Sequence, residues 1–307
     1  MSRRSTTWLR FASSCVVALC LLQTAAAQSC GRDVNNTLCD NGFCCSQFGF
    51  CGVSDAYCGA GCQSQCPPPS PPPGPPAVST SGLDKTLNRS TFDLLFPDRN
   101  SRFYTYDAFI LAGNKFPKFG TEGPKAVRLR EIAAFAAHIQ QETAGLIYIR
   151  EIDQSNSYCD ATSTQWPCAP GQKYFGRGPL QISWNYNYGP AGKALKANIL
   201  AQPDLVAQDA VLAFSSALWF WNTAREGGIP SIHNVLVGKY RPTYADLKAG
   251  RKPGFGLTIL IINGGLECGK VTPQATNRIS YFKDRVALLG TFAGDNLSCD
   301  KMTPYGS

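Results

Sequence analysis

The stretch CCSQFGFCGVSDAYCGAGCQSQC, residues 44–66, divides the chain into two kinds of structure. Together with Cys30 and Cys39 it holds eight of the fourteen cysteines of the 307-residue chain. A segment this short cannot bury enough apolar surface to fold without cross-links. We therefore predict a small module held together by four disulfide bonds, followed by a larger domain that folds by ordinary burial.

Three aromatic residues of this stretch, Phe48, Phe50 and Tyr57, lie in a segment too small to bury them. Rings held rigidly on a surface can stack on the apolar faces of sugars, and the hydroxyl of Ser46 is available to a sugar acetamide or hydroxyl group. The alternative is that one or two of the rings cover a disulfide bond. Composition alone leaves both interpretations open.

The first 27 residues have the pattern of an export signal. Three arginines precede a mostly apolar stretch, Phe11 to Leu22, and three alanines at 25–27 provide a cleavage site. We expect secretion to the extracellular space, with vacuolar retention as the alternative destination. Removal of the signal also removes Cys15 and Cys20, which leaves twelve cysteines, an even number that fits six disulfide bonds and no free thiol.

A proline-rich segment, PPPSPPPGPP at 67–76, follows the cysteines and is typical of an extended spacer. The residues beyond it are enough for one domain with a sizeable core, and their apolar spacing predicts helices at 127–142, 210–221 and 277–289. The predicted division is a signal peptide at 1–27, a cysteine-rich module at 28–66, a linker at 67–82 and a large domain at 83–307.

Charge and motif content exclude several classes of protein. The formal net charge of +8 falls to about +5 without the three signal arginines, and the remaining basic residues form no block, so we expect no nucleic-acid partner. No run of about 20 apolar residues indicates a membrane anchor. The two histidines, His138 and His233, form no zinc-protease motif, so we expect neither a metal nor a cofactor.

Glu142 stands out in the predicted helix at 127–142. The apolar residues Ile132, Phe135 and Ile139 form one line, and the same spacing of three and four places Glu142 at its end. A carboxyl group on a buried stripe loses hydration, which raises its pKa and suits it to be a general acid. The alternative is a surface pair with His138, four residues earlier.

A second carboxyl group follows nine residues later. If residues 146–152 are extended, Glu151 shares a face with Ile147 and Ile149, while Arg150 points away. Cleavage of a glycosidic bond requires two carboxyl groups in different environments, one to protonate the leaving oxygen and one to activate water or attack carbon. The spacing leaves open which of the two geometries applies.

The small module resembles the hevein family of chitin-binding domains from Gln28 to Cys66, through the adjacent cysteines, the glycines and the closing GAGCQSQC at 59–66. The resemblance implies that carbohydrate is held by Ser46, Phe48, Phe50 and Tyr57. It also implies the disulfide bonds Cys30–Cys45, Cys39–Cys51, Cys44–Cys58 and Cys62–Cys66.

Segments that resemble the plant-type family 19 chitinases span nearly all of the large domain. They are QET at 141–143, YC at 158–159, WPC at 166–168, KYFGRGPLQISWNYNYGP at 173–190, ALWFW at 217–221 and INGGLEC at 262–268. The resemblance implies a mainly α-helical, lysozyme-like bilobal catalytic domain. The four remaining cysteines fit the pairs Cys159–Cys168 and Cys268–Cys299.

In this family Glu142 matches the general acid and Glu151 the general base of an inverting hydrolysis, with Ser183 helping to hold the attacking water. The wide carboxyl separation of inverting enzymes leaves room for that water. Glu267 and Arg278 match charged residues that tune the catalytic pair, although a structural ion pair is the alternative. The positions that line the sugar cleft are matched by Trp166, Gln181, Tyr186, Asn187 and Asn263.

The chain departs from the family at several positions. Gln141 replaces the histidine that often precedes the acid, Ala144 replaces a common threonine, and Ile147 stands where class IV members usually have a cysteine. The short gap between the glutamates resembles the loop-deleted class IV, whereas the insertion at 237–253 is typical of longer, class I forms.

We therefore expect a secreted, monomeric endochitinase that binds chitin and chitin oligosaccharides and hydrolyses β-1,4-linked N-acetylglucosamine polymers with inversion. One alternative is a non-hydrolytic chitin-binding defence lectin. The other is a hydrolase of a related polymer such as peptidoglycan. Retention of both Glu142 and Glu151 argues against the lectin.

Overall fold

The structure is a computed structural model that describes residues 29–59, 61–66 and 82–306. The predicted signal peptide at 1–27 and nearly all of the predicted linker at 67–82 lie outside the described residues. The boundaries of the four predicted parts therefore stay predictions. We refer to residues 29–66 as the small module and to residues 82–306 as the helical domain.

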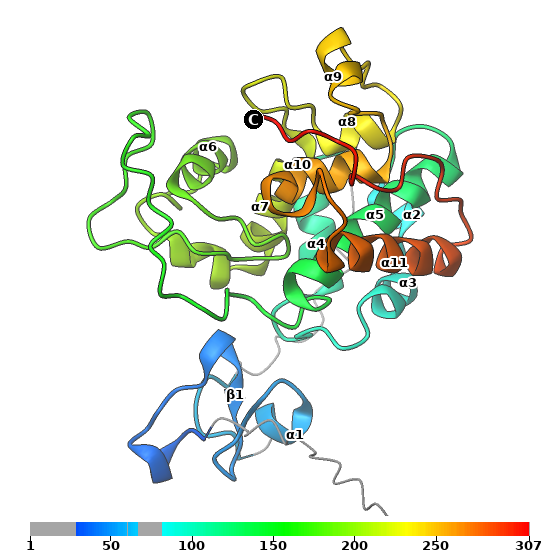
Figure 1. The fold of residues 1–307 in the computed structure, drawn as a ribbon. Coiled ribbons are helices and arrows are strands. Elements are labelled where there is room, and N and C mark those ends of the chain that lie inside the picture. Colours follow the sequence, from blue (N-terminus) through cyan, green and yellow to red (C-terminus); the bar gives the residue numbers. More distant parts are fainter. Residues whose placement is uncertain (1–28, 60, 67–81, 307) are drawn as a thin grey trace, which may run out of the picture.

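The described residues confirm the predicted fold class, a disulfide-rich small module and a mainly α-helical larger domain (Figure 1). In them the one sheet is the antiparallel pair β1 and β2, with Cys44 opposite Gly52. None of their helices is long and apolar enough to cross a membrane. The elements are η1 (Arg32–Val34), η2 (Asp40–Gly42), β1 (Cys44–Cys45), β2 (Cys51–Gly52), α1 (Asp55–Cys58), α2 (Leu83–Thr86), α3 (Arg89–Leu95), α4 (Tyr106–Gly113), α5 (Lys125–Thr143), α6 (Asn185–Leu195), η3 (Pro203–Ala207), α7 (Ala210–Asn222), α8 (Ile232–Leu236), α9 (Tyr244–Lys248), α10 (Phe255–Glu267) and α11 (Pro273–Leu288).

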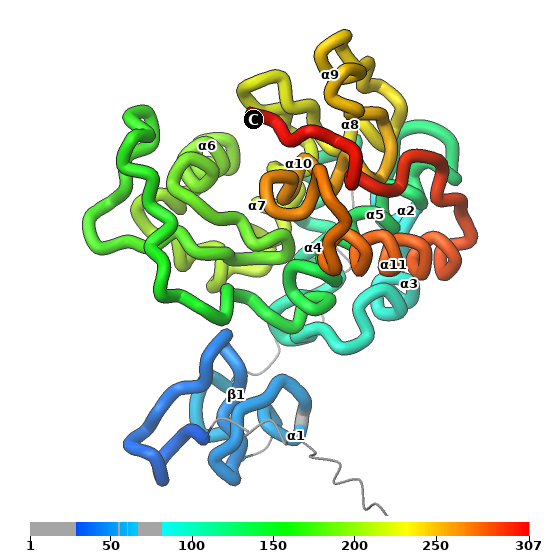
Figure 2. Tube along the Cα trace, viewed as in Figure 1, coloured from blue at the N-terminus to red at the C-terminus, as the bar shows by residue number. Residues whose placement is uncertain are grey.

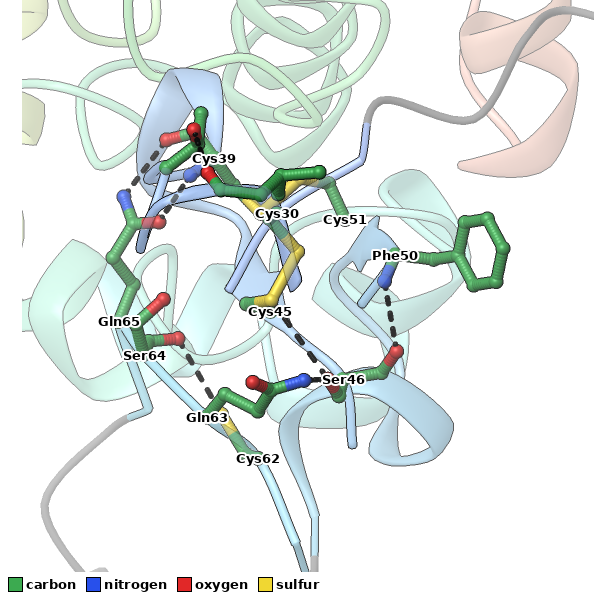
Figure 3. The surroundings of a disulfide bond; sticks show 12 residues. Cys30, Cys39, Cys45, Ser46, Phe50, Cys51, Cys62, Gln63, Ser64 and Gln65 are labelled. Atoms are coloured by element: carbon green, nitrogen blue, oxygen red, sulfur yellow. Dashed lines mark hydrogen bonds between the residues drawn. A yellow bond between two sulfur atoms is a disulfide. The ribbon is translucent and has the colours of Figure 1, made fainter. Parts of the chain in front are cut away.

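Disulfide bonds replace an apolar core in the small module. Cys30, Cys39 and Cys45 are buried at its centre, and Figure 3 shows their sulfur atoms close together. Their Sγ atoms lie within 4.8 Å of one another, but each is bonded to another sulfur, so none is a thiolate that could bind a metal. The Gln65 amide adds a further link, because it accepts from the Cys39 amide at 2.6 Å and donates to the Cys39 carbonyl at 2.8 Å.

Among the described residues there are six disulfide bonds, four of them the pairs that the hevein resemblance implies and two the pairs that the remaining cysteines fit. They are Cys30–Cys45, Cys39–Cys51, Cys44–Cys58, Cys62–Cys66, Cys159–Cys168 and Cys268–Cys299.

Helix α5 lies at the centre of the helical domain. Its apolar residues Ile132, Phe135 and Ile139 are buried, and α11 packs against it more extensively than any other two described helices pack together. Both helices are visible side by side in Figure 1. The observed bounds extend the predicted helix by two residues at its start and by one at its end. The carboxyl end of α5 is therefore anchored against a second helix.

Helix α7 lies between α4 and α6. Asp209 caps its start by accepting from the Leu212 amide at 3.0 Å, and most of its residues are buried. It packs against α4 on one side and against α6 on the other, as the tube in Figure 2 shows. Between α5 and α6 the chain follows a long irregular path, residues 144–184, on the α6 side. Of the predicted carboxylates, Glu142 lies in the last turn of α5 and Glu151 lies on this irregular path.

Candidate active site

A cleft of about 1280 Å³ contains both predicted carboxylates. It is lined by the carboxyl end of α5, the irregular segment, the start of α6, and residues of α7 and α10. Glu267 and Arg278 do not line it but lie behind Glu142. The predicted residues that line the cleft are Glu142, Glu151, Trp166, Gln181, Ser183, Tyr186, Asn187 and Asn263.

The backbone directly after Glu142 ends the helix abruptly. The buried hydroxyl of Thr143 donates to the Ile139 carbonyl at 3.0 Å and accepts from the Leu146 amide at 3.1 Å. Ala144 and Leu146 both have positive φ angles, 50° and 73°. This left-handed turn directs the chain away from the helix axis, so that Glu142 stands in the last turn with its side chain 20% exposed.

Arg278 connects the Glu142 carboxylate to a second, fully enclosed carboxylate. Its Nη2 donates to Oε1 of Glu142, while Nε and Nη2 donate to the two oxygens of Glu267, each at 2.8 Å. Asn263 adds a donor to Glu267 at 2.8 Å. Burial raises the pKa of Glu142 and outweighs the opposing charge of Arg278. Arg278 and Glu267 form an ion pair, and this pair contacts Glu142 through Arg278; their role in tuning the catalytic pair stays a prediction.

The alternative of a surface pair between Glu142 and His138 is wrong. The His138 side chain is buried, with 0% of its surface exposed. Its ring nitrogens contact Thr258 at 2.8 Å and Arg278 at 3.2 Å. The helix period predicts that His138 and Glu142 are neighbours, but it does not show that α10 and α11 cover the histidine.

Glu151 is held by neutral donors from the irregular segment 144–184. Oε1 accepts from the Tyr158 hydroxyl at 2.6 Å, and Oε2 accepts from the Gly176 amide at 2.8 Å. The Glu151 amide in turn donates to the Gly176 carbonyl at 2.8 Å. The hydrogen bond from the Tyr158 hydroxyl to Glu151, together with burial, raises the pKa of Tyr158 to about 12. Both carboxylate oxygens keep lone pairs that could accept from a water molecule.

The ring of Trp166 packs directly on Gly189 of α6. A Cβ atom at position 189 would lie 2.3 Å from the ring, so this approach requires glycine. Tyr186 is 41% exposed at the rim and stacks on Trp184 with ring centroids 5.6 Å apart. Trp166, Trp184 and Tyr186 all line the cleft, and aromatic rings are surfaces on which sugars stack.

Two predicted polar residues of the cleft are fixed by the backbone around Ser183. Asn187 donates to the Ser183 carbonyl at 2.9 Å, and Gln181 donates to the Gly178 carbonyl at 3.0 Å. Their remaining polar atoms stay available to a ligand.

Tyr158, Trp184 and Arg225 are among the cleft residues that were not predicted as site residues. Tyr158 bonds Glu151, Trp184 packs edge-on against Tyr158 at 5.3 Å, and Arg225 stacks on Phe220 at 3.9 Å. Burial lowers the pKa of Arg225 to about 10. Tyr158 and Trp184 stand in the quoted motifs, but spacing alone does not indicate their contacts.

The four predicted carbohydrate contacts of the small module differ in exposure. Phe48 is 72% and Phe50 44% exposed, which argues against a role in covering a disulfide bond. Tyr57 is half-buried and lies over Gly52, where a Cβ atom would be 2.4 Å from its ring. Ser46 is less available than predicted: it is 3% exposed, and its Oγ accepts from the Phe50 amide at 3.1 Å (Figure 3). Its O–H and one lone pair remain for a further partner.

Comparison with known proteins gives matches over both parts of the chain. The family model described as chitinase class I matches residues 86–299, and the model described as chitin recognition protein matches residues 29–66. A basic endochitinase of Vitis vinifera is 45% identical, with 95% of this chain and 96% of the relative covered. An endochitinase of Phaseolus vulgaris is also 45% identical, with 94% and 91% covered.

Solved structures resemble the helical domain. A family GH19, class IV chitinase from Zea mays is 43% identical with a TM-score of 0.59, covering 70% of this chain and 98% of that one. Chitinase C from Streptomyces griseus is 41% identical with a TM-score of 0.61, covering 70% and 80%. The family model spans more than half of the chain and the relatives align over nearly all of it. The chain therefore belongs to the class I chitinase family of glycoside hydrolases, with a chitin recognition module before the family domain.

Proposed function

We propose that the protein is an endochitinase that hydrolyses β-1,4-linked N-acetylglucosamine polymers, with Glu142 as general acid and Glu151 as general base. The observation that carries this proposal is the contrast between the two carboxyl groups of one cleft. Glu142 stands beside a buried ion pair and has a raised pKa, whereas Glu151 accepts two hydrogen bonds from neutral donors. Such a contrast separates an acid from a base.

In the proposed reaction, protonated Glu142 gives its proton to the departing glycosidic oxygen. Before this step the charges of Arg278 and Glu267 balance each other. When Glu142 becomes a carboxylate, Arg278 is already in contact with it and stabilises the new charge without moving. A water molecule held by Glu151 and Ser183 attacks the anomeric carbon from the opposite face and passes its proton to Glu151, which inverts the configuration.

The small module would hold the enzyme on insoluble chitin through Phe48, Phe50 and Tyr57. Two exposed rings and a third half-buried one suit stacking on successive sugars. Attachment through a linker raises the local concentration of substrate at the cleft without any new contact there. We further propose that the protein is secreted, acts as a monomer, and has no membrane or nucleic-acid partner.

The test uses a soluble chitin hexamer, the parent protein and the variants Glu142→Gln and Glu151→Gln. Products and their anomeric form are followed by proton NMR immediately after cleavage. We expect the parent to release α-anomers and each variant to lose about 10²-fold or more in rate. Absence of cleavage by the parent would favour the lectin alternative, and release of β-anomers would contradict the role of Glu151 as base. Faster cleavage of peptidoglycan than of chitin would show that chitin is not the preferred substrate.

A further inference from the structure

His138 is a buried titratable residue that the proposed reaction does not use. It lies on α5, one turn before Glu142, and none of its side chain is exposed. Both ring nitrogens have polar partners: Nε2 lies 2.8 Å from Oγ1 of Thr258 on α10, and Nδ1 lies 3.2 Å from Nη1 of Arg278 on α11. The imidazole thus connects α10 with the guanidinium that contacts Glu142.

The hydrogen-bond partners determine where the imidazole carries its proton. The single hydroxyl proton of Thr258 is donated to the Phe255 carbonyl at 2.6 Å, so Oγ1 must accept from Nε2–H of His138. An arginine can only donate, and Nδ1 must therefore present its lone pair to Arg278. His138 is consistent with one state only, the neutral Nε2–H tautomer. Burial, aided by the charge of Arg278, lowers its pKa well below the usual value.

The acceptor on His138 completes the surroundings of the Arg278 guanidinium. Glu267 accepts from Nε and Nη2, Glu142 accepts from Nη2, and His138 accepts from Nη1. Without His138, no described side chain accepts from Nη1 of this 1% exposed guanidinium. The imidazole is itself held in place, because it stacks on Phe255 with ring centroids 4.8 Å apart.

We propose that His138 is a positioning residue for the catalytic acid: as a neutral hydrogen-bond acceptor it holds Arg278 in the orientation that contacts Glu142. This inference rests on the proposed function, in which Glu142 is the acid. A protonated imidazole would offer no acceptor and would repel the guanidinium, so the neutral state is a condition of the role. Thr258 contributes indirectly by fixing the tautomer.

The variants His138→Asn and His138→Phe separate the acceptor from the ring. In asparagine Oδ1 is bonded to Cγ like Nδ1 of histidine, so the acceptor is kept, whereas phenylalanine keeps the ring on Phe255 and loses the acceptor. We expect His138→Phe to lower kcat on a soluble chitin hexamer about tenfold with KM changed less than about twofold, since a hydrogen bond to a charged group is lost. His138→Asn should recover most of kcat.

The pH dependence of kcat provides a readout that a merely structural role would not move. The charged groups near Glu142 are Arg278 from α11, Glu267 from α10 and Glu151, which lines the same cleft. If Arg278 loses its orientation, less positive charge opposes the effect of burial, so the pKa of Glu142 rises further. The alkaline limb of the kcat profile should therefore shift to higher pH in His138→Phe and return in His138→Asn. A variant with a lower Tm but an unchanged alkaline limb would overturn the proposal.

A second measurement tests the proposal without any activity. The chain contains two histidines, so ¹⁵N NMR of the parent resolves both rings, and a His138 variant identifies each signal. We expect His138 to stay a neutral Nε2–H tautomer between about pH 5 and pH 8. The Nδ1–H tautomer, or protonation within this range, would overturn the positioning role even if His138→Phe failed to fold. An inactive parent with the expected tautomer would instead count against the proposed function.

Discussion

A buried glutamate on α5 depends on a single cationic partner among the described residues. Glu131 has none of its surface exposed, and its carboxylate accepts from the Gly120 amide at 2.9 Å and from Nε1 of Trp221 at 3.0 Å. Its one cationic partner among the described residues is His233, whose Nδ1 lies 2.6 Å away. The other ring nitrogen of His233 contacts Glu122 at 2.9 Å.

The substitution His233→Phe removes the cation and leaves the buried carboxylate of Glu131 with two neutral donors. Removing one partner of a buried ion pair costs about 3–5 kcal/mol, because the remaining charge stays away from water. This is a large share of the roughly 5–15 kcal/mol by which domains are stable. The matched control is Glu122→Gln, since Glu122 is 27% exposed and pairs mainly with solvent-facing Lys239. We expect the control to cost less than about 1 kcal/mol.

The loss should depend on pH in a defined direction. Burial alone would lower the pKa of His233, but the hydrogen bonds and charges of Glu131 and then Glu122 outweigh it and raise the pKa. A raised pKa contributes stability that is complete below the usual value of about 6.5 and disappears as pH rises through the folded-state value. The difference in free energy of unfolding between parent and His233→Phe should therefore be largest near pH 6 and shrink in alkaline solution.

The assay is urea unfolding with the disulfide bonds intact, followed by tryptophan fluorescence. Trp221 donates to Glu131, and the other described tryptophans also lie in the helical domain. A loss below about 1 kcal/mol in His233→Phe, or an equal loss in Glu122→Gln, would refute the assignment of an uncompensated buried charge. If His233→Phe does not fold, Trp221→Phe replaces it, with an expected cost of about 1.5–3 kcal/mol for one donor to a carboxylate.

Three further predictions concern other parts of the chain. Phe48→Ala should weaken retention on insoluble chitin by roughly 1 kcal/mol without changing hydrolysis of soluble oligomers, because the exposed ring is a stacking surface; equal retention in a pull-down would contradict this. Ala144→Gly should raise stability by up to about 1 kcal/mol in thermal unfolding, since φ is 50° and a Cβ atom is strained there; a lower Tm would show that the methyl group has a packing role. In the parent, the raised pKa of Glu142 means that stability falls as pH rises from about 4.5 through the folded-state pKa. Glu142→Gln should therefore be the more stable protein at neutral pH. Parallel curves of stability against pH for the two proteins would argue against a raised pKa.

The sequence predicts the local elements of the fold better than their contacts. The helical spacing that places Glu142 beside Ile139 is a property of the segment itself, and α5 follows it. At α11 the apolar spacing starts late, and the prediction begins at Asn277. The helix begins four residues earlier, because the Thr272 hydroxyl caps it by accepting from the Ala275 amide at 3.2 Å and Pro273 suits the first turn.

Contacts across the chain explain what the sequence could not predict at the site. His138 meets Thr258 from 120 positions away, and Arg278 meets Glu142 from 136 positions away. Helix periodicity places each residue on a face but does not show which element covers that face. The family resemblance supplied Arg278 and Glu267 as charged neighbours of the acid, whereas the acceptor that orients Arg278 was visible only once α5, α10 and α11 were packed together.

One face of α5 carries three polar residues in a stripe that burial would ordinarily fill with apolar side chains. Glu131, His138 and Glu142 are spaced by seven and four residues and therefore lie on the same side of the helix. The first two are fully enclosed, each with partners from elements far along the chain, whereas Glu142 opens to the cleft. If the pair of Glu131 and His233 only fixes the helix, substitutions at His233 should change stability and leave the alkaline limb of kcat in place. Substitutions at His138 should move that limb, because His138 alone of the two enclosed residues reaches the acid through Arg278.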